Sequence, residues 1–184
     1  PNILQTDRGQ VKANCVVHAT NGYHCSLNRK QAARVMPINT FLVATAPLEV
    51  PKSVLAHDIS VADNRFVLHY YRLSDDNRLI FGGGESYGTK FPQDIFKKVR
   101  RPLTEIFPQL ANIDLTHAWG GTLGITTTRL PMFARVGHQQ LTASGYSGHG
   151  VALAGFAGLV LAETIAGNAT RFDLLSKLPG PAFP

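Results

Sequence analysis

The sequence predicts an α+β fold: a mixed, largely antiparallel sheet with flanking helices, plus further strands and a long C-terminal helix. Short β-branched and aromatic runs separated by turn residues occupy most of the chain. One helical stripe lies in the middle of the chain, and a helix rich in small residues lies near its end. The 184 residues are enough for one domain or slightly more.

Strands make up most of the predicted elements. The run at 65–73 is the clearest, with Tyr70 and Arg72 on one face and Tyr71 on the other. The turn at 7–9 predicts a hairpin between the first two strands. The predicted strands are residues 3–6, 11–19, 38–45, 65–73, 78–83, 116–125, 132–136 and 139–143.

Three segments have helical character, at residues 27–35, 93–107 and 148–166. Apolar residues recur on one side of the 93–107 segment. Pro102 inside it predicts a kink or a break into two helices, because proline donates no backbone hydrogen bond.

The charge balance is basic, with 18 Lys and Arg against 12 Asp and Glu and a formal net charge of +6. The dense basic cluster Lys97, Lys98, Arg100 and Arg101 lies on the 93–107 helix without aromatic residues arranged to stack on bases. This pattern favours a solvated helix face over a nucleic-acid interface.

The two cysteines, Cys15 and Cys25, have no metal-ligand spacing. They suit free thiols in a reducing compartment, with a disulfide between them as the minority alternative. The first residues do not resemble a signal peptide, and the longest apolar run, 151–162, is too short to cross a bilayer. We therefore expect a cytoplasmic protein without a membrane partner.

Two glycine motifs are candidates for function. Residues 145–150, GYSGHG, lie between a strand and the last helix, where free amide groups and the helix dipole favour an anion or an electron-rich carbonyl. A tight turn without a ligand is the alternative. Small residues at 150, 154, 158, 162 and 166 form a ridge for packing or for a flat ligand. Gly82-Gly83-Gly84 marks a sharp turn or a close backbone approach.

Conventional catalytic sets are absent from the sequence. The seven histidines show no metal-ligand pairing, so no metal site is expected, and there is neither a nucleophile elbow nor a Walker motif. Trp119, followed by two glycines, is either a core anchor or a substrate contact.

A series of motifs covers nearly the whole chain, in the order GQV, CVVHATNGY, FLVATAPL, HYYRLSDDNRLIFGGG, IFPQL, WGGT, RLP and SGYSGHGVALA. In this order they resemble the D-amino-acid-oxidase-like superfamily of FAD-dependent amine oxidoreductases. The resemblance implies non-covalent FAD and a substrate sheet over the flavin. It makes Tyr70, Arg72 and Trp119 candidates for substrate binding and names no catalytic base. The candidates for cofactor binding are Gly121, Gly145, Tyr146, Ser147, Gly148, His149, Gly150 and Val151.

The resemblance also implies a domain division. Residues 1–35 and 137–184 correspond to parts of a FAD-binding domain, and residues 36–136 correspond to the substrate-binding domain. Family members begin with a G-x-G-x-x-G strand and helix, which this sequence does not contain. We expect the chain to be the C-terminal part of a longer flavoprotein, inactive and weak in FAD binding without its N-terminal half. An exposed FAD-side surface would also allow a homo-oligomer.

Departures from the family pattern bear on the substrate. Leu123-Gly124 replaces the Arg-Pro that clamps a substrate carboxylate in many relatives, and Ala152 replaces the lysine of the sarcosine-oxidase-like branch. The flavin-linking cysteine of that branch has no counterpart near Trp119. The T-x-x-R-L-P pattern at 126–131 is closer to the gamma-glutamylputrescine oxidase-like branch.

The implied reaction is oxidation of an amine C–N bond by hydride transfer to flavin. A cationic amine needs a local carboxylate in so basic a protein, and Glu85 or Asp63 could supply it. The alternative, from another functional class, is a catalytically silent binding or assembly module that keeps the substrate-domain fold.

Overall fold

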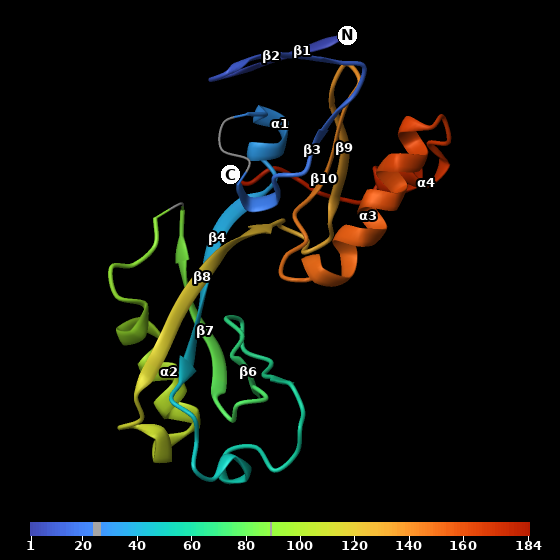
Figure 1. Ribbon diagram of the computed structural model, residues 1–184. Coiled ribbons are helices and arrows are strands. Elements are labelled where there is room, and N and C mark those ends of the chain that lie inside the picture. The colour runs from blue at the N-terminus through green and yellow to red at the C-terminus, as the bar shows by residue number, and fades with distance from the viewer. Residues whose placement is uncertain (24–26, 89) are drawn as a thin grey trace. The chain divides into compact units, whose positions relative to one another are not determined.

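The computed structural model describes residues 1–23, 27–88 and 90–184, which form two compact units (Figure 1). Unit 1 comprises Pro1–Pro37 and Leu123–Pro184, and unit 2 comprises Ile38–Thr122. Each unit contains its own sheet and its own hydrophobic cluster, which confirms the α+β prediction. Within these described ranges, no helix combines the length and apolar composition needed to cross a bilayer.

Unit 1 is built on the three-stranded sheet β3-β10-β9. Strand β10 (Gln140–Ser144) pairs in parallel with β3 (Val16–His18) and antiparallel with β9 (Met132–Gly137). The helices α3 (Gly150–Ile165) and α4 (Thr170–Leu175) contribute to the core of this unit. That core consists of Phe133, Leu141, Ala143, Ala157, Val160, Leu161 and Phe172.

The N-terminal strands of unit 1 differ from the sequence prediction. The hairpin consists of β1 (Asn2–Thr6) and β2 (Gly9–Ala13), and the expected strand at 11–19 is divided between β2 and β3. The division arises because β2 pairs back onto β1, whereas β3 pairs with β10 in a different sheet. A short helix, α1 (Arg29–Ala32), lies within the predicted helical segment and begins where the Asn28 side chain accepts a hydrogen bond from the Gln31 amide.

Unit 2 is built on a five-stranded sheet in the order β5-β6-β7-β4-β8. These strands are β5 (Val61–Ala62), β6 (Tyr70–Leu73), β7 (Leu79–Tyr87), β4 (Met36–Thr45) and β8 (Leu115–Ile125). The helix α2 (Ile95–Ile106) packs on one face of this sheet, and we call the other side the open face. Strand β4 enters unit 2 from unit 1, and β8 leads back to it.

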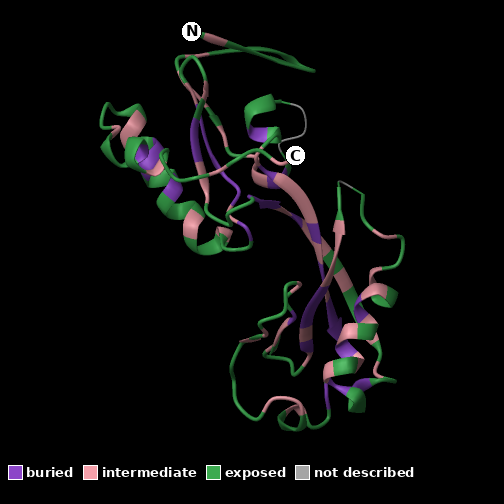
Figure 2. Ribbon diagram, turned by 180° about the vertical axis from the view of Figure 1, so that it is seen from behind, coloured by how far each residue is buried: buried purple, intermediate pink, exposed green. Residues whose placement is uncertain are grey.

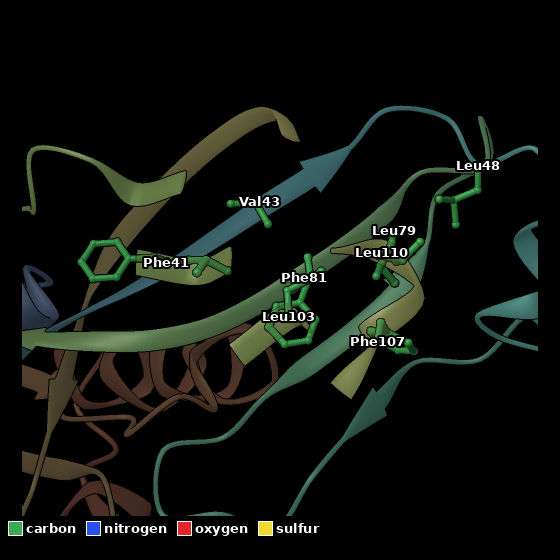
Figure 3. Close-up of a cluster of buried hydrophobic side chains, with 9 residues drawn as sticks. Phe41, Val43, Leu48, Leu79, Phe81, Leu103, Phe107 and Leu110 are labelled. Atoms are coloured by element: carbon green, nitrogen blue, oxygen red, sulfur yellow. The ribbon is translucent and has the colours of Figure 1, made fainter. Parts of the chain in front are cut away.

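The core of unit 2 lies between the sheet and α2 (Figure 3). The rings of Tyr71 and Phe81 stack with centroids 5.8 Å apart, and Phe107 meets Tyr71 edge-on at 5.0 Å. Such aromatic contacts add to the free energy gained by burial alone. The buried members of the cluster are Phe41, Val43, Leu48, Leu79, Phe81, Val99, Leu103, Phe107 and Leu110.

Two sequence predictions in unit 2 are wrong in part. Strand β6 begins at Tyr70 instead of residue 65, because the Asp63 carboxylate accepts hydrogen bonds from the Arg65 and His69 amides and holds this segment in a loop. The expected break at Pro102 does not occur, and α2 is one helix. The proline ring packs beside Gly83 of β7, with its Cγ 3.6 Å from the position that a Cβ on Gly83 would take.

The division between the units also bears on the expected domain boundaries. The first boundary, expected after residue 35, lies after Pro37 in the structure. The second was expected after residue 136, yet residues 123–136 group with unit 1. They do so because β9 pairs with β10, so the polar loop before β9 is attached to the sheet of unit 1.

Replacing Phe81 with alanine should lower the free energy of unfolding of unit 2 by about 3–5 kcal/mol, because it removes a fully buried ring from the aromatic core. Tyr87→Ala is a matched control on the same strand, since Tyr87 is 63% exposed, and it should change stability by about 0.5 kcal/mol. Chemical denaturation followed by circular dichroism measures both. Equal losses for the two variants would contradict this description of the core.

Candidate functional site

The open face of the unit 2 sheet carries the first group of predicted site residues. On β4, Phe41 and Val43 point into the core, so Thr40 and Leu42 point to the open face. The Tyr70 hydroxyl lies 3.1 Å from Thr40 Oγ1, which places Tyr70 on the same face. Its ring occupies the space where a side chain at Gly82 would stand. A glycine on β7 therefore lets the tyrosine lie flat across the sheet.

Strand β8 adds Trp119 and Gly121 to the open face. A Cβ atom placed on Gly120 would meet the Phe41 ring at 2.8 Å, so position 120 points toward α2. Its neighbours 119 and 121 therefore point the opposite way. Trp119 is 41% exposed, so its alternative interpretation as a core anchor is wrong. Nothing lies within 4 Å of a Cβ at Gly121, which leaves open space beside the tryptophan.

Two adjacent tyrosines of strand β6 point to opposite faces of the sheet. Tyr71 stacks on Phe81, so it is the tyrosine that joins the core. Tyr70 and Arg72 alternate with it on the open face. The Arg72 guanidinium is exposed and donates to the Leu73 carbonyl at 3.0 Å. The sequence-predicted residues Tyr70, Arg72, Trp119 and Gly121 thus share one face of one sheet.

The second group forms the turn between β10 and α3 in unit 1. Gly145, Ser147 and Gly148 all have positive φ angles, of 72°, 52° and 97°. The Gly145 amide donates to Asn21 Oδ1 at 2.9 Å, and the Ser147 amide donates to the Gly124 carbonyl at 2.9 Å. The backbone of the turn is therefore held from two directions by segments distant in sequence.

Side-chain hydrogen bonds fix the same turn further. The buried Ser147 hydroxyl lies 3.1 Å from the Gly145 carbonyl and 3.3 Å from the Thr126 amide. The Tyr146 hydroxyl donates to the Ala143 carbonyl at 3.0 Å, and burial raises the pKa of Tyr146. Tyr146 is thus neutral near pH 7, and its hydroxyl ties the turn to the end of β10.

The helix α3 that follows the turn has no side-chain cap. His149 occupies the N-cap position with φ −97° and ψ 19°, and its side chain makes no capping hydrogen bond. The amides of the first turn, which include Gly150 and Val151, have no acceptor within the helix. The Val151 side chain is fully exposed, and a Cβ at Gly148 would meet nothing within 4 Å. This end of the helix offers accessible donors and a positive dipole end.

Glycines allow three segments to meet behind the turn. A Cβ on Gly22 would lie 2.5 Å from the Leu123 carbonyl oxygen, and one on Gly124 would collide with the Asn21 side chain. A Cβ on Gly145 would collide with the Thr126 methyl group. We call this contact of Asn21, Gly22, Gly124, Thr126 and Gly145 the glycine junction. The local sequence does not show which backbone will approach Asn21 and Gly22, because the contact joins segments distant in the chain.

Helix α3 is apolar around nearly its whole circumference, yet only Ala157, Val160 and Leu161 are buried (Figure 2). The ridge of small residues lines a groove of about 340 Å³ between the helix and strands β3 and β10. Val17 and Tyr146 form part of its other wall. A helix that is apolar all round belongs in an interior. This part of unit 1 therefore has the composition of a surface that another layer covers.

Asp63, one of the two carboxylates that the sequence offers to a cationic amine, is already bound to neighbouring residues. Its Oδ2 lies 3.1 Å from His69 Nδ1 and 3.4 Å from Arg65 Nε. Burial by itself would raise the pKa of Asp63, but hydrogen bonds from the His69 and Arg65 amides, together with electrostatic interactions with the same two residues, lower it below its usual value. The carboxylate is therefore engaged inside the loop it organises.

The basic cluster on α2 is largely engaged within unit 2. Arg100 donates to the Ala111 and Ile113 carbonyls, and Arg101 pairs with Glu105 one turn away. Lys98 lies 5.9 Å from the centroid of the Phe41 ring. These contacts agree with the interpretation of the cluster as a helix face.

Among the described residues, the remaining His, Cys, Asp and Glu side chains do not form a metal site. Across residues 1–23, 27–88 and 90–184, no group of three or more metal-ligating side chains comes together. Cys15 packs beside the unit 1 core as a free thiol, and Cys25, with which a disulfide was the minority alternative, lies outside the described residues.

The fold and the glycine turn before α3 agree with the sequence comparison, in which residues 2–164 match the family described as DAO, FAD dependent oxidoreductase. The chain belongs to this family of FAD-dependent oxidoreductases. The family resemblance inferred from the ordered motifs is thereby confirmed.

Two curated relatives match nearly the whole of this chain. The chain is 44% identical to a probable oxidoreductase OrdL of Rhizobium meliloti (strain 1021), over 99% of this chain and 42% of that protein. It is 37% identical to gamma-glutamylputrescine oxidoreductase of Escherichia coli (strain K12), over 100% of this chain and 44% of that protein. The chain thus spans less than half the length of these curated relatives.

Among solved structures, glycine oxidase from Geobacillus kaustophilus superposes with a TM-score of 0.71 at 19% identity. The match covers 89% of this chain and 45% of that one. It supports the α+β fold described above.

The glycine junction predicts a rescue experiment. Gly145→Ala should destabilise the protein more than Gly148→Ala, because both positions have positive φ but only the first collides with the Thr126 methyl group. We expect a difference of about 1–3 kcal/mol in the free energy of unfolding. Adding Thr126→Ser removes the methyl group and keeps the hydroxyl that bonds the Leu130 carbonyl, so it should restore most of the loss. Equal effects of the two alanine variants, without rescue, would contradict this packing.

Proposed function

We propose that this chain is the C-terminal part of a FAD-dependent oxidoreductase that oxidises the C–N bond of an amine or amino-acid-like substrate, with gamma-glutamylputrescine as the preferred candidate. The observation that carries the proposal is the fixed glycine turn that ends in the uncapped N-terminus of α3. FAD, when bound, supplies the N5 atom that accepts a hydride from the carbon bearing the amine. Family membership supports FAD as the cofactor.

The residues of the turn fit an electron-rich carbonyl of the flavin. The backbone amides of Gly148, Gly150 and Val151 would be its donors, since no side chain caps them and no Cβ at Gly148 would obstruct the approach. The His149 amide already donates to the Tyr146 carbonyl at 2.9 Å. Donors fixed before the reaction stabilise developing negative charge without reorganisation. Asn21 and Ser147 act indirectly, because they hold the turn that presents the amides.

The open face of unit 2 is the proposed substrate surface. Tyr70 and Trp119 supply flat apolar contacts, and Arg72 supplies a positive charge at one edge. The substrate choice is supported by the absence of a carboxylate clamp at the family's usual place. Leu123 stands at the position of the clamping arginine, and Ala152 carries no charge. An amine conjugate fits these residues better than a free amino acid does.

We also propose that this chain is part of a longer polypeptide. The free edge of β3, the groove beside it and the exposed apolar residues of α3 are surfaces that a remaining part of a FAD-binding domain would cover. On this proposal the chain alone is inactive and binds FAD weakly. Relatives more than twice its length support this view.

The purified full-length protein should show the visible spectrum of oxidised flavin, and anaerobic gamma-glutamylputrescine should bleach it. Glycine and proline are the comparison substrates, because they carry a carboxylate beside the amine. Bleaching by an amino acid alone would keep the class of enzyme and overturn the proposed substrate. A protein purified without flavin, and unable to bind added FAD, would overturn the class as well.

Replacing Val151 with proline removes one amide of the first helical turn, a position where proline is tolerated. The reduced flavin should lose about 1 kcal/mol of stabilisation, which lowers a two-electron reduction potential by roughly 20 mV. Equilibration with a reference dye measures the potential. Val151→Ala keeps the amide and should leave the potential unchanged, whereas equal shifts in both variants would contradict a role for this donor.

A further inference from the structure

A β-bulge in β7 changes which way its last residues point. The pairing with β4 passes from Leu42 opposite Gly82 to Thr40 opposite Glu85, so two glycines of β7 stand opposite Phe41. A Cβ on Gly83 would meet His69, Phe81 and Pro102, and one on Gly84 would meet Lys98. Both glycines therefore point toward α2, and the alternation of the strand shifts by one residue.

The shift turns Glu85 to the open face. Its partner Thr40 points to that face, where it contacts the Tyr70 hydroxyl. The next residue, Ser86, points to the core side, where its hydroxyl accepts a hydrogen bond from Asn39 Nδ2 at 3.2 Å. Without the bulge, position 85 would share the face of Phe81 and bury a carboxylate beneath α2.

Glu85 is half-buried, and its carboxylate has no hydrogen-bond or ion-pair partner among residues 1–23, 27–88 and 90–184. Asp63, the other acid considered, is engaged with His69 and Arg65. A partly desolvated carboxylate gains most from a cation that supplies the missing hydrogen bonds. Glu85 is therefore the available acid on the face that carries Tyr70 and Trp119.

We propose that Glu85 is the substrate-binding carboxylate that recognises a cationic amine, with the aromatic rings of Tyr70 and Trp119 beside it on the open face. This inference rests on the proposed function, since it assigns the amine specificity of the same sheet face to one residue. A carboxylate accepts charge-assisted hydrogen bonds from the N–H groups of an ammonium, and aromatic faces attract the same charge. The β-bulge at Gly83-Gly84 turns this carboxylate to the open face.

The test compares Glu85→Gln with Glu49→Gln in the full-length flavoprotein, because Glu49 is an exposed acid of unit 2 outside the sheet. Steady-state kinetics with gamma-glutamylputrescine should show KM raised about tenfold or more in the Glu85 variant and kcat changed much less. Glu85→Asp, which keeps the charge, should recover part of the affinity. The wild-type KM should rise with salt, and the Glu85→Gln value should not.

Calorimetric measurement of butylamine binding tests the role of Glu85 independently of the proposed oxidation. If the wild-type protein oxidises amines, and Glu85→Gln leaves both KM and the affinity for butylamine unchanged, the role of Glu85 alone is overturned. A wild-type protein that oxidises no amine, yet binds butylamine through Glu85, would overturn the proposed function alone. Absence of both oxidation and binding would overturn both.

Discussion

Close backbone approach at glycine is the constraint on which the rest of this structure depends. In unit 1, Gly22, Gly124 and Gly145 bring the end of one turn, the end of β8 and the start of the turn before α3 into direct contact. A methyl group at any of these positions would overlap a neighbouring atom. The donors at the N-terminus of α3 are therefore positioned by packing between segments more than 100 residues apart, and not by the local turn sequence alone.

The same constraint acts differently in the unit 2 sheet. Gly82 makes room for the Tyr70 ring across the strands, and Gly83 makes room for the His69 and Phe81 rings on the side of α2. The bulge formed with Gly84 then moves Glu85 from one face to the other. Three consecutive glycines thus determine both how the helix packs on one side and which polar groups appear on the other.

On the proposed function, the exposed apolar face of α3 would link this chain energetically to the remaining part of a FAD-binding domain. Leaving Phe156, Leu159 and Ile165 in water forgoes their transfer free energy, about 25 cal/mol for each Å² of apolar surface. A covering layer would recover it and would also pair the free edge of β3. On the proposed function, cofactor binding and completion of this core would therefore occur together.

The sequence by itself determined the α+β class, most strand positions, the segments that form α1, α2 and α3, and the family, because these depend on local periodicity and ordered motifs. It also indicated a ligand site or tight turn at 145–150 and a sharp turn or close backbone approach at the glycine triplet 82–84. It gave no signal for α4. Only the tertiary structure decided that Trp119 is exposed, that Tyr71 and not Tyr70 joins the core, and that Glu85 faces away from α2. These outcomes depend on strand register and on contacts between distant segments, which a local pattern does not encode.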